Sequence, residues 1–112
     1  MANYPKFQVF KSTYNNQYYF RLRAVNTEII LSGEGYLTKQ ACLNGIGSVK
    51  ANAPYDFRYV RRDGVTNFTF NLKAANGEII GRSENYTTRA ARENGIAAVK
   101  RDAPAAPVED LS

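Results

Sequence analysis

The 112-residue sequence contains no histidine and no tryptophan, and it has one cysteine and one methionine. Without histidine the chain lacks the side chain that most often performs acid–base chemistry near neutral pH and most often binds metals. A single cysteine excludes both a disulfide within the chain and a multi-cysteine zinc site. No apolar run reaches the roughly 18 residues of a membrane span or the length of a signal peptide. We therefore expect a cytoplasmic protein that does not enter membranes and holds no cofactor.

The remaining composition is that of an ordinary folded domain. Hydrophobic residues make up 44% of the chain and charged residues 22%, with 15 Lys and Arg against 10 Asp and Glu, for a net charge of +5. Such values are typical of a globular domain rather than a disordered segment, and the length suits one domain over 1–112. The excess of positive charge is modest.

An internal duplication organises the chain. Residues 20–54 align with residues 70–104 without a gap, and 18 of the 35 positions are identical. At the same offset of 50, Phe7 pairs with Phe57. Two copies are too few for a solenoid, so we expect two repeats, about 4–54 and 55–110, that share one core around a pseudo-twofold axis.

Alternating apolar and polar residues predict strands in both repeats. Positions 18, 20, 22 and 24 form one apolar face, positions 19, 21, 23 and 25 form the other face, and positions 68–75 repeat the pattern. An earlier strand is predicted around Phe7 and Val9, and in the second repeat around Phe57 and Tyr59. A period of two with one apolar face is typical of an antiparallel sheet that is covered on one side. A short final strand is predicted around Val108.

A tight turn and one helix follow in each repeat. Asn76-Gly77 predicts a two-residue type I′ hairpin, and at the equivalent Thr27 either the residue is strained or the turn differs. Thr38 and Thr88 are predicted N-caps of helices that end before Pro54 and Pro104.

Each predicted helix carries an apolar stripe with a glycine in it. Gly45 and Gly95 cost helix stability, so we expect packing that leaves no room for a methyl group. Arg92 replaces Cys42 between the copies, which predicts that this position lies at the edge of the stripe.

The ordered motifs resemble a known family. They are Leu72–Ile80, Ser83–Tyr86, Asn94–Ile96 and Val99-Lys100, and the sequence is similar in these runs to the YegP-like family of small bacterial and archaeal domains. The resemblance implies an α+β fold with two tandem β-β-β-α-β units, one continuous sheet with helices on one face, and exchanged C-terminal strands. Thr27 and Asn85 stand where the family usually has glycine. The resemblance implies no activity.

Few residues suggest catalysis. Cys42 has no histidine to activate it, and the preferred interpretation is a small apolar residue at a helix edge. The repeated pairs Glu28/Glu78, Glu34/Glu84 and Tyr36/Tyr86 leave an enzyme as a distant alternative, which requires carboxyl groups that converge on one cleft. Otherwise Glu28 and Glu78 flank a hairpin, and Glu34 and Glu84 interact with helix starts.

The outward sheet face is the feature that suggests binding. It combines positive charge with aromatic surface, and the candidate partner-binding residues are Tyr19, Arg21, Arg23 and Lys73, with Lys11, Arg61 and Arg62 at nearby strand ends. Single-strand nucleic-acid binders use this mixture, although antiparallel sheets also solvate such a face. We expect a small, non-enzymatic binding or structural module with an unidentified partner; nucleic acid is the alternative. Because two fused repeats can complete one sheet, a monomer is predicted.

Overall fold

The computed structural model describes residues 4–112, which form seven strands, two α-helices and two short 3-10 helices. The elements are, in chain order, β1 (Lys6–Lys11), β2 (Tyr18–Arg23), β3 (Ile29–Ser32), α1 (Lys39–Asn52), η1 (Asp56–Arg58), β4 (Tyr59–Asp63), β5 (Phe68–Lys73), β6 (Ile79–Arg82), α2 (Arg89–Asp102), η2 (Ala103–Ala105) and β7 (Val108–Asp110). The predicted repeat of strands followed by a helix is therefore confirmed.

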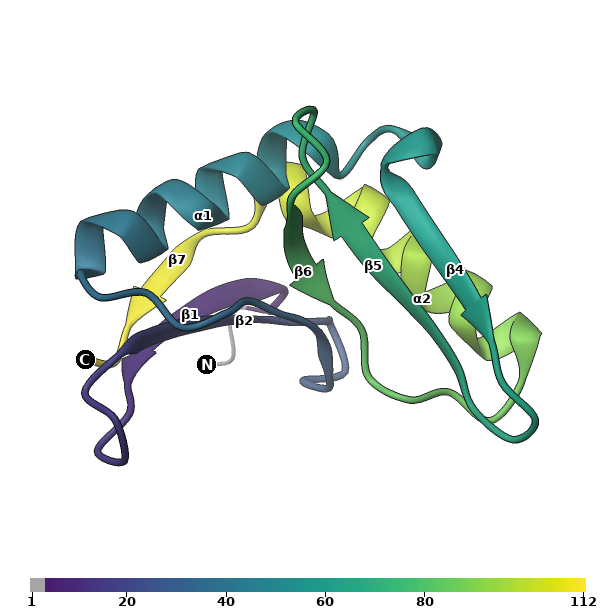
Figure 1. Ribbon diagram of the computed structural model, residues 1–112, viewed down its shortest axis with the longest axis horizontal. Helices are drawn as coiled ribbons and strands as arrows, with labels where there is room; N and C mark the ends of the chain where they lie inside the picture. The colour runs from purple at the N-terminus through teal and green to yellow at the C-terminus, as the bar shows by residue number, and fades with distance from the viewer. Residues whose placement is uncertain (1–3) are drawn as a thin grey trace.

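All seven strands belong to one sheet in the order β4-β5-β6-β3-β2-β1-β7 (Figure 1). The two repeats meet in its middle, where Ser32 of β3 pairs with Arg82 of β6. The sheet is mixed, because β7 runs parallel to β1 while the other pairs are antiparallel. The prediction of a purely antiparallel sheet was therefore wrong at this edge.

The parallel strand is the exchanged C-terminal strand of the second repeat; the expectation of an exchanged strand from the first repeat was wrong, because α1 is followed by η1 and β4. β7 follows the second-repeat helix yet lies beside β1 of the first repeat, the yellow and purple strands of Figure 1. The Phe7 N–H donates to the Pro107 carbonyl at 2.8 Å, and the Leu111 N–H donates to the Val9 carbonyl at 2.7 Å. The end of the chain thus covers the sheet edge at which it begins.

The pairing of Phe7 with Phe57 was wrong. Phe7 lies opposite Leu22, and the residue opposite the equivalent Leu72 is Tyr59. The connection between β1 and β2 is two residues longer than that between β4 and β5, so the offset changes from 50 to 52 upstream of it. Phe57 instead lies in η1 and is 72% exposed.

The core lies between the helices and the inner face of the sheet. Phe7, Phe20, Phe70, Leu22 and Leu72 are almost fully buried there. α1 contacts β1, β2, β5 and β6, so it crosses both repeats and delivers the chain to β4. One apolar cluster joins residues of both repeats, as the pseudo-twofold prediction requires.

The predicted helix signals are confirmed in detail. The Thr38 and Thr88 hydroxyls accept the N–H groups of Ala41 and Ala91 at 3.1 and 3.0 Å, which satisfies one free donor at each helix start. A Cβ added to Gly45 would lie 2.3 Å from the Tyr36 hydroxyl. The close neighbour of this glycine is therefore the tyrosine at the strand–helix corner.

The predicted type I′ turn was wrong. In the turn between β5 and β6, Gly77 has positive φ, whereas Asn76 does not. The Gly77 N–H donates to the Ala74 carbonyl, and the Ala74 N–H donates to the Glu78 carbonyl, so the loop has three residues with glycine last. In the first repeat Thr27 adopts the same conformation at φ 71°, so this turn is strained.

Candidate binding surface on the outer face of the sheet

Phe10, Tyr19, Arg21 and Arg23 lie together on the face of the sheet opposite the helices. With Gln8 we call them the outer-face cluster. β1 and β2 alternate, so the register places Phe10 beside Tyr19 and Gln8 beside Arg21. The Phe10 and Tyr19 rings stack with centroids 5.9 Å apart, and the Arg21 guanidinium lies 4.6 Å from the Phe10 centroid. An aromatic pair and a cation thus form one surface.

Gln8 holds the two arginines in place. Its Oε1 accepts from the Nε of Arg21 at 2.9 Å and from the Nε of Arg23 at 2.7 Å. Its Nε2 donates to Glu109 of β7 at 2.8 Å, and Lys6 bonds the other carboxylate oxygen of Glu109 at 3.1 Å. Gln8 is only 6% exposed although it points away from the core. The exchanged strand therefore helps to organise the cluster.

The two guanidinium groups keep their charge unpaired. Among residues 4–112, neither Arg21 nor Arg23 forms an ion pair with a carboxylate, because the acceptor between them is a neutral amide. Burial lowers the pKa of Arg21, and the neighbouring charge of Arg23 lowers it further. Since a like charge disfavours the cation, an anion at this place would be stabilised.

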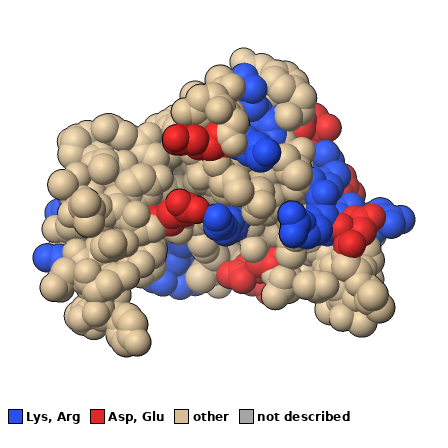
Figure 2. Space-filling model, in the orientation of Figure 1, with Lys and Arg blue, Asp and Glu red and all other residues tan. Residues whose placement is uncertain are grey.

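Most arginines of the second repeat, in contrast, form ion pairs. All arginines that form ion pairs in residues 4–112 lie in the second repeat. They are Arg61, Arg82, Arg89, Arg92 and Arg101. Figure 2 shows basic and acidic side chains next to one another in the centre and on the right of the view, rather than one basic field. Arg58 and Arg62 also lack an ion pair among the described residues, so what distinguishes the outer-face cluster is that two unpaired guanidinium groups share one acceptor.

The structure separates the other predicted site residues from this cluster. Lys73 lies on the outer face but in β5, beyond β3 and β6. Lys11 pairs with Tyr18 on the helix side, where its ammonium lies 5.5 Å from the Tyr18 ring centroid. Arg61 also lies on the helix side, paired with Asp56 and Glu93. The prediction that Lys11 and Arg61 extend the outward face was wrong, because they share the inward phase of their strands.

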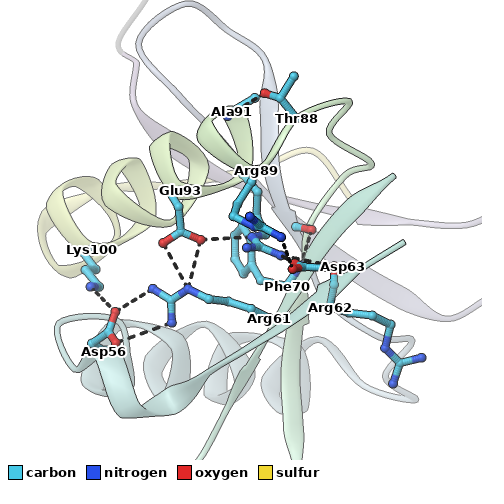
Figure 3. Close-up of polar contacts among 12 residues, drawn as sticks. Asp56, Arg61, Arg62, Asp63, Phe70, Thr88, Arg89, Ala91, Glu93 and Lys100 are labelled. Carbon is cyan, nitrogen blue, oxygen red and sulfur yellow. Dashed lines mark hydrogen bonds and ion pairs between the residues drawn. The ribbon is translucent and has the colours of Figure 1, made fainter. Parts of the chain in front are cut away.

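A network of ion pairs replaces apolar packing between β4 and α2 (Figure 3). Arg61 takes the place that Val9 has in β1, and it bonds Asp56 at 2.8 Å and Glu93 at 3.0 Å. The hydrogen bond from Arg61 to Asp56, with one from Lys100, lowers the pKa of Asp56 to about 2. Asp56 and Glu93 are thus each bonded to at least one cation.

Arg92 belongs to the same network and is buried, with only 3% of its side chain exposed. The prediction that position 92 lies at the stripe edge was wrong. Arg92 donates to Asp63 and to Glu93, and it also donates to the Arg62 carbonyl at 3.2 Å. These bonds satisfy a buried guanidinium where Cys42 fills the equivalent place with apolar volume.

Glu28 of the first repeat and Glu84 of the second line one cavity of about 450 Å³ together with Tyr86. A cavity of about 490 Å³ near the β2–β3 turn is lined by Glu28 and Tyr86, together with Asn94, but Glu78 does not line it. Glu34 bonds Arg82 at 2.7 Å instead of a helix start, so that expectation was wrong. Burial raises the pKa of Tyr86, to which Glu84 and Glu28 contribute.

Other reactive groups lack a site. Cys42 is buried, and burial raises the pKa of its thiol to about 11. Within residues 4–112 no group of three or more cysteine or acidic side chains is placed to hold a metal ion. In the same residues, no helix has the length and apolar character to cross a bilayer.

Sequence reasoning missed Gln8 and Phe10. Both lie in β1, whose alternation places them on the polar face of the sheet, where a glutamine is expected to contact only solvent. Their role depends on the register of β1 against β2 and on the arrival of Glu109 from the far end of the chain. The alternation predicts the face, but it does not predict these contacts.

The fold defines a class: a tandem-repeat α+β protein with one sheet completed by strand exchange. The family model described as a domain of unknown function, DUF1508, matches residues 14–59 and again residues 65–110. The chain belongs to this family, whose members named UPF0339 include YegP, and the predicted YegP-like resemblance is confirmed.

Two solved structures are similar over almost the whole chain. The solution structure of UPF0339 protein SO3888 from Shewanella oneidensis is 41% identical with a TM-score of 0.88, covering 95% of this chain and 90% of that one. The solution structure of yegP from E. coli, a protein of unknown function, is 43% identical with a TM-score of 0.87, covering 95% of this chain and 91% of that one.

Among curated relatives, UPF0339 protein YegP of Yersinia pestis is 44% identical over 57 residues, which are 51% of each chain. The UPF0339 protein in the ptx operon 5′ region of Stutzerimonas stutzeri is 54% identical over 46 residues, 41% of each chain. These matches span about half the length of the relatives or less. The family is uncharacterised, as the resemblance implied.

Proposed function

We propose that this protein is a non-enzymatic binding module whose outer-face cluster binds single-stranded nucleic acid. The observation that carries the proposal is the pair of guanidinium groups, Arg21 and Arg23, that share a neutral acceptor and have no carboxylate partner in residues 4–112. Phosphate oxygens would take the charge, and the Phe10–Tyr19 ring pair would offer a face on which a base stacks. An open sheet surface suits an extended strand better than a small substrate.

Several features support a role without catalysis. Cys42 is buried with a raised pKa, so the single thiol is a poor nucleophile at neutral pH. Glu78 lines neither of the two cavities that Glu28 lines, although Glu84 lines one of them, and the perturbed carboxylates Asp56, Asp63 and Glu93 bond to arginines. Because Asp56, Asp63 and Glu93 are all bonded to arginines, none of them is a free carboxyl group of the kind that acid–base catalysis needs.

The test is the affinity of a fluorescein-labelled single-stranded oligothymidine, measured by anisotropy across a salt series. Each phosphate contact with single-stranded DNA contributes about 0.7 to the slope of log affinity against log salt. Replacing Arg21 and Arg23 by glutamate should therefore lower that slope by about 1.4 and weaken binding at low salt.

A matched control separates the cluster from net charge. The variant Arg62→Glu with Lys73→Glu makes the same charge change on exposed or half-buried positions of the second repeat. It should keep the slope of the unmodified protein. Equal losses in both variants would mean nonspecific attraction, and the absence of binding even at low salt would refute the nucleic-acid proposal.

A further inference from the structure

The two ends of the sheet are not equivalent, although the repeats that form them are. β1 is covered by β7, whereas β4, which occupies the place of β1 in the second half, pairs only with β5 among the described strands. The repeat thus provides eight strand positions, and the described chain fills seven of them. The unfilled position lies along the outer edge of β4.

The cause is the path of the chain after each helix. After α2 the chain crosses to β1 and forms β7, but after α1 it passes through η1 directly into β4. The Tyr59 N–H donates to the Asp56 carbonyl of η1, where the equivalent Phe7 N–H donates to Pro107. In the second half, η1 therefore replaces only the first of the hydrogen bonds that a strand like β7 would form with β4.

The later peptide groups of β4 face the open edge. Arg61 lies opposite Phe70, and the Phe70 main chain bonds Ser83 on its other side. Because neighbouring rungs of an antiparallel pair alternate, the Arg61 N–H and carbonyl point away from β5. An unpaired strand edge of this kind is a template for another strand.

The charges at this edge match those that hold β7. In the first half Lys6 bonds Glu109 at 3.1 Å, and Lys39 bonds Asp110 at 2.8 Å. Their counterparts in the second half are also cations. Arg58 precedes Tyr59 as Lys6 precedes Phe7, and Arg89 begins α2 as Lys39 begins α1.

Both counterpart cations, Arg58 and Arg89, can form a further bond with a carboxylate. The Nε of Arg58 is buried and has no hydrogen-bond partner among the described residues. Arg89 bonds Asp63, yet 67% of its side chain is exposed. The cations that fix acidic side chains of a parallel strand are thus repeated, while the strand itself is missing.

We propose that the outer edge of β4 binds an extended acidic segment of a partner protein, which runs parallel to β4 as β7 runs parallel to β1. A second copy of this chain fits less well. Donating its β7 would uncover its own β1, and pairing two β4 strands edge to edge would bring Arg61 and Arg62 of both copies together.

The probe is a synthetic peptide with the sequence of residues 105–112, AAPVEDLS, added to the full-length protein. Amide hydrogen exchange read by NMR should slow at Arg61 in proportion to bound peptide. A Glu109→Pro peptide lacks both the central N–H and the carboxylate, so it should give no protection. Unchanged Arg61 exchange at saturating concentration, or protection near Phe7 instead, would overturn the proposal.

Two protein variants test the charge match. Arg89→Ala removes a cation at the edge, whereas Arg101→Ala removes one of similar exposure, 64%, that bonds Asp102 at the end of α2. We expect Arg89→Ala to weaken peptide binding up to about fivefold, the size of one exposed ion pair, and Arg101→Ala to leave it unchanged. Equal effects would contradict the proposal, as would a dimer that already protects Arg61 without peptide.

Discussion

The hydroxyl of Tyr36 leaves no room for a methyl group at Gly45. A Cβ there would lie 2.3 Å from the hydroxyl oxygen and 2.8 Å from Cζ, both well inside van der Waals contact. Gly47, two residues further along the same helix, has no atom of the described residues within 4 Å of the equivalent point. The two glycines therefore form a matched pair for measuring the cost of the close contact.

Opposite effects on stability are expected. Alanine is better than glycine in a helix by about 1 kcal/mol, so Gly47→Ala should raise the free energy of unfolding by about that amount. At Gly45 the same gain is offset by overpacking of about 1–3 kcal/mol. Gly45→Ala should therefore be less stable than Gly47→Ala by about 1–3 kcal/mol.

Urea unfolding followed by circular dichroism measures both values, with the slope on urea concentration as a check on two-state behaviour. Adding Tyr36→Phe removes the nearest atom, so the penalty of Gly45→Ala should shrink in that background. If Gly45→Ala and Gly47→Ala were equally stable, the close packing of tyrosine over the helix would be refuted.

Three further outcomes are expected. Thr27→Gly should stabilise the protein by about 1 kcal/mol in urea unfolding, because glycine relieves the positive φ that Gly77 already accommodates; no gain would contradict the strain. The pKa of Asp56 is about 2 folded against an ordinary 3.8, so its stabilisation is complete above 3.8 and is lost as pH falls toward 2. The stability gap between the protein and Asp56→Asn should therefore close over that range, and a constant gap would contradict the ion pairs. Cys42 should react with Ellman's reagent at pH 8 only after unfolding; rapid native reaction would show it is accessible.

Much of the fold could be predicted because the duplication repeats each local signal. The alternation in residues 18–24, the caps at Thr38 and Thr88 and the close packing of Gly45 all depend on near neighbours. The strand at Phe57 could not be placed correctly, since a two-residue difference between connections shifts the alignment upstream. The direction of β7 also depends on a partner about a hundred residues away.

The candidate site was predicted only in part. Tyr19, Arg21 and Arg23 follow one another along a strand, so the period of two groups them correctly. The alternation of its strand directs Arg61 toward the helices. An arginine is nevertheless predicted to be exposed unless its acidic partners are known. Gln8 becomes important only through Glu109, which the sequence alone does not bring near.

The central claim is that one chain completes its own sheet, with the first repeat covered by the end of the second. An isotope-filtered NOE experiment on mixed labelled and unlabelled protein tests it directly. We expect contacts between Phe7 and Val108, and between Ser32 and Arg82, to arise within single molecules and to persist on dilution. If those contacts were found only between molecules, the sheet would be completed by a partner copy and the account would be wrong.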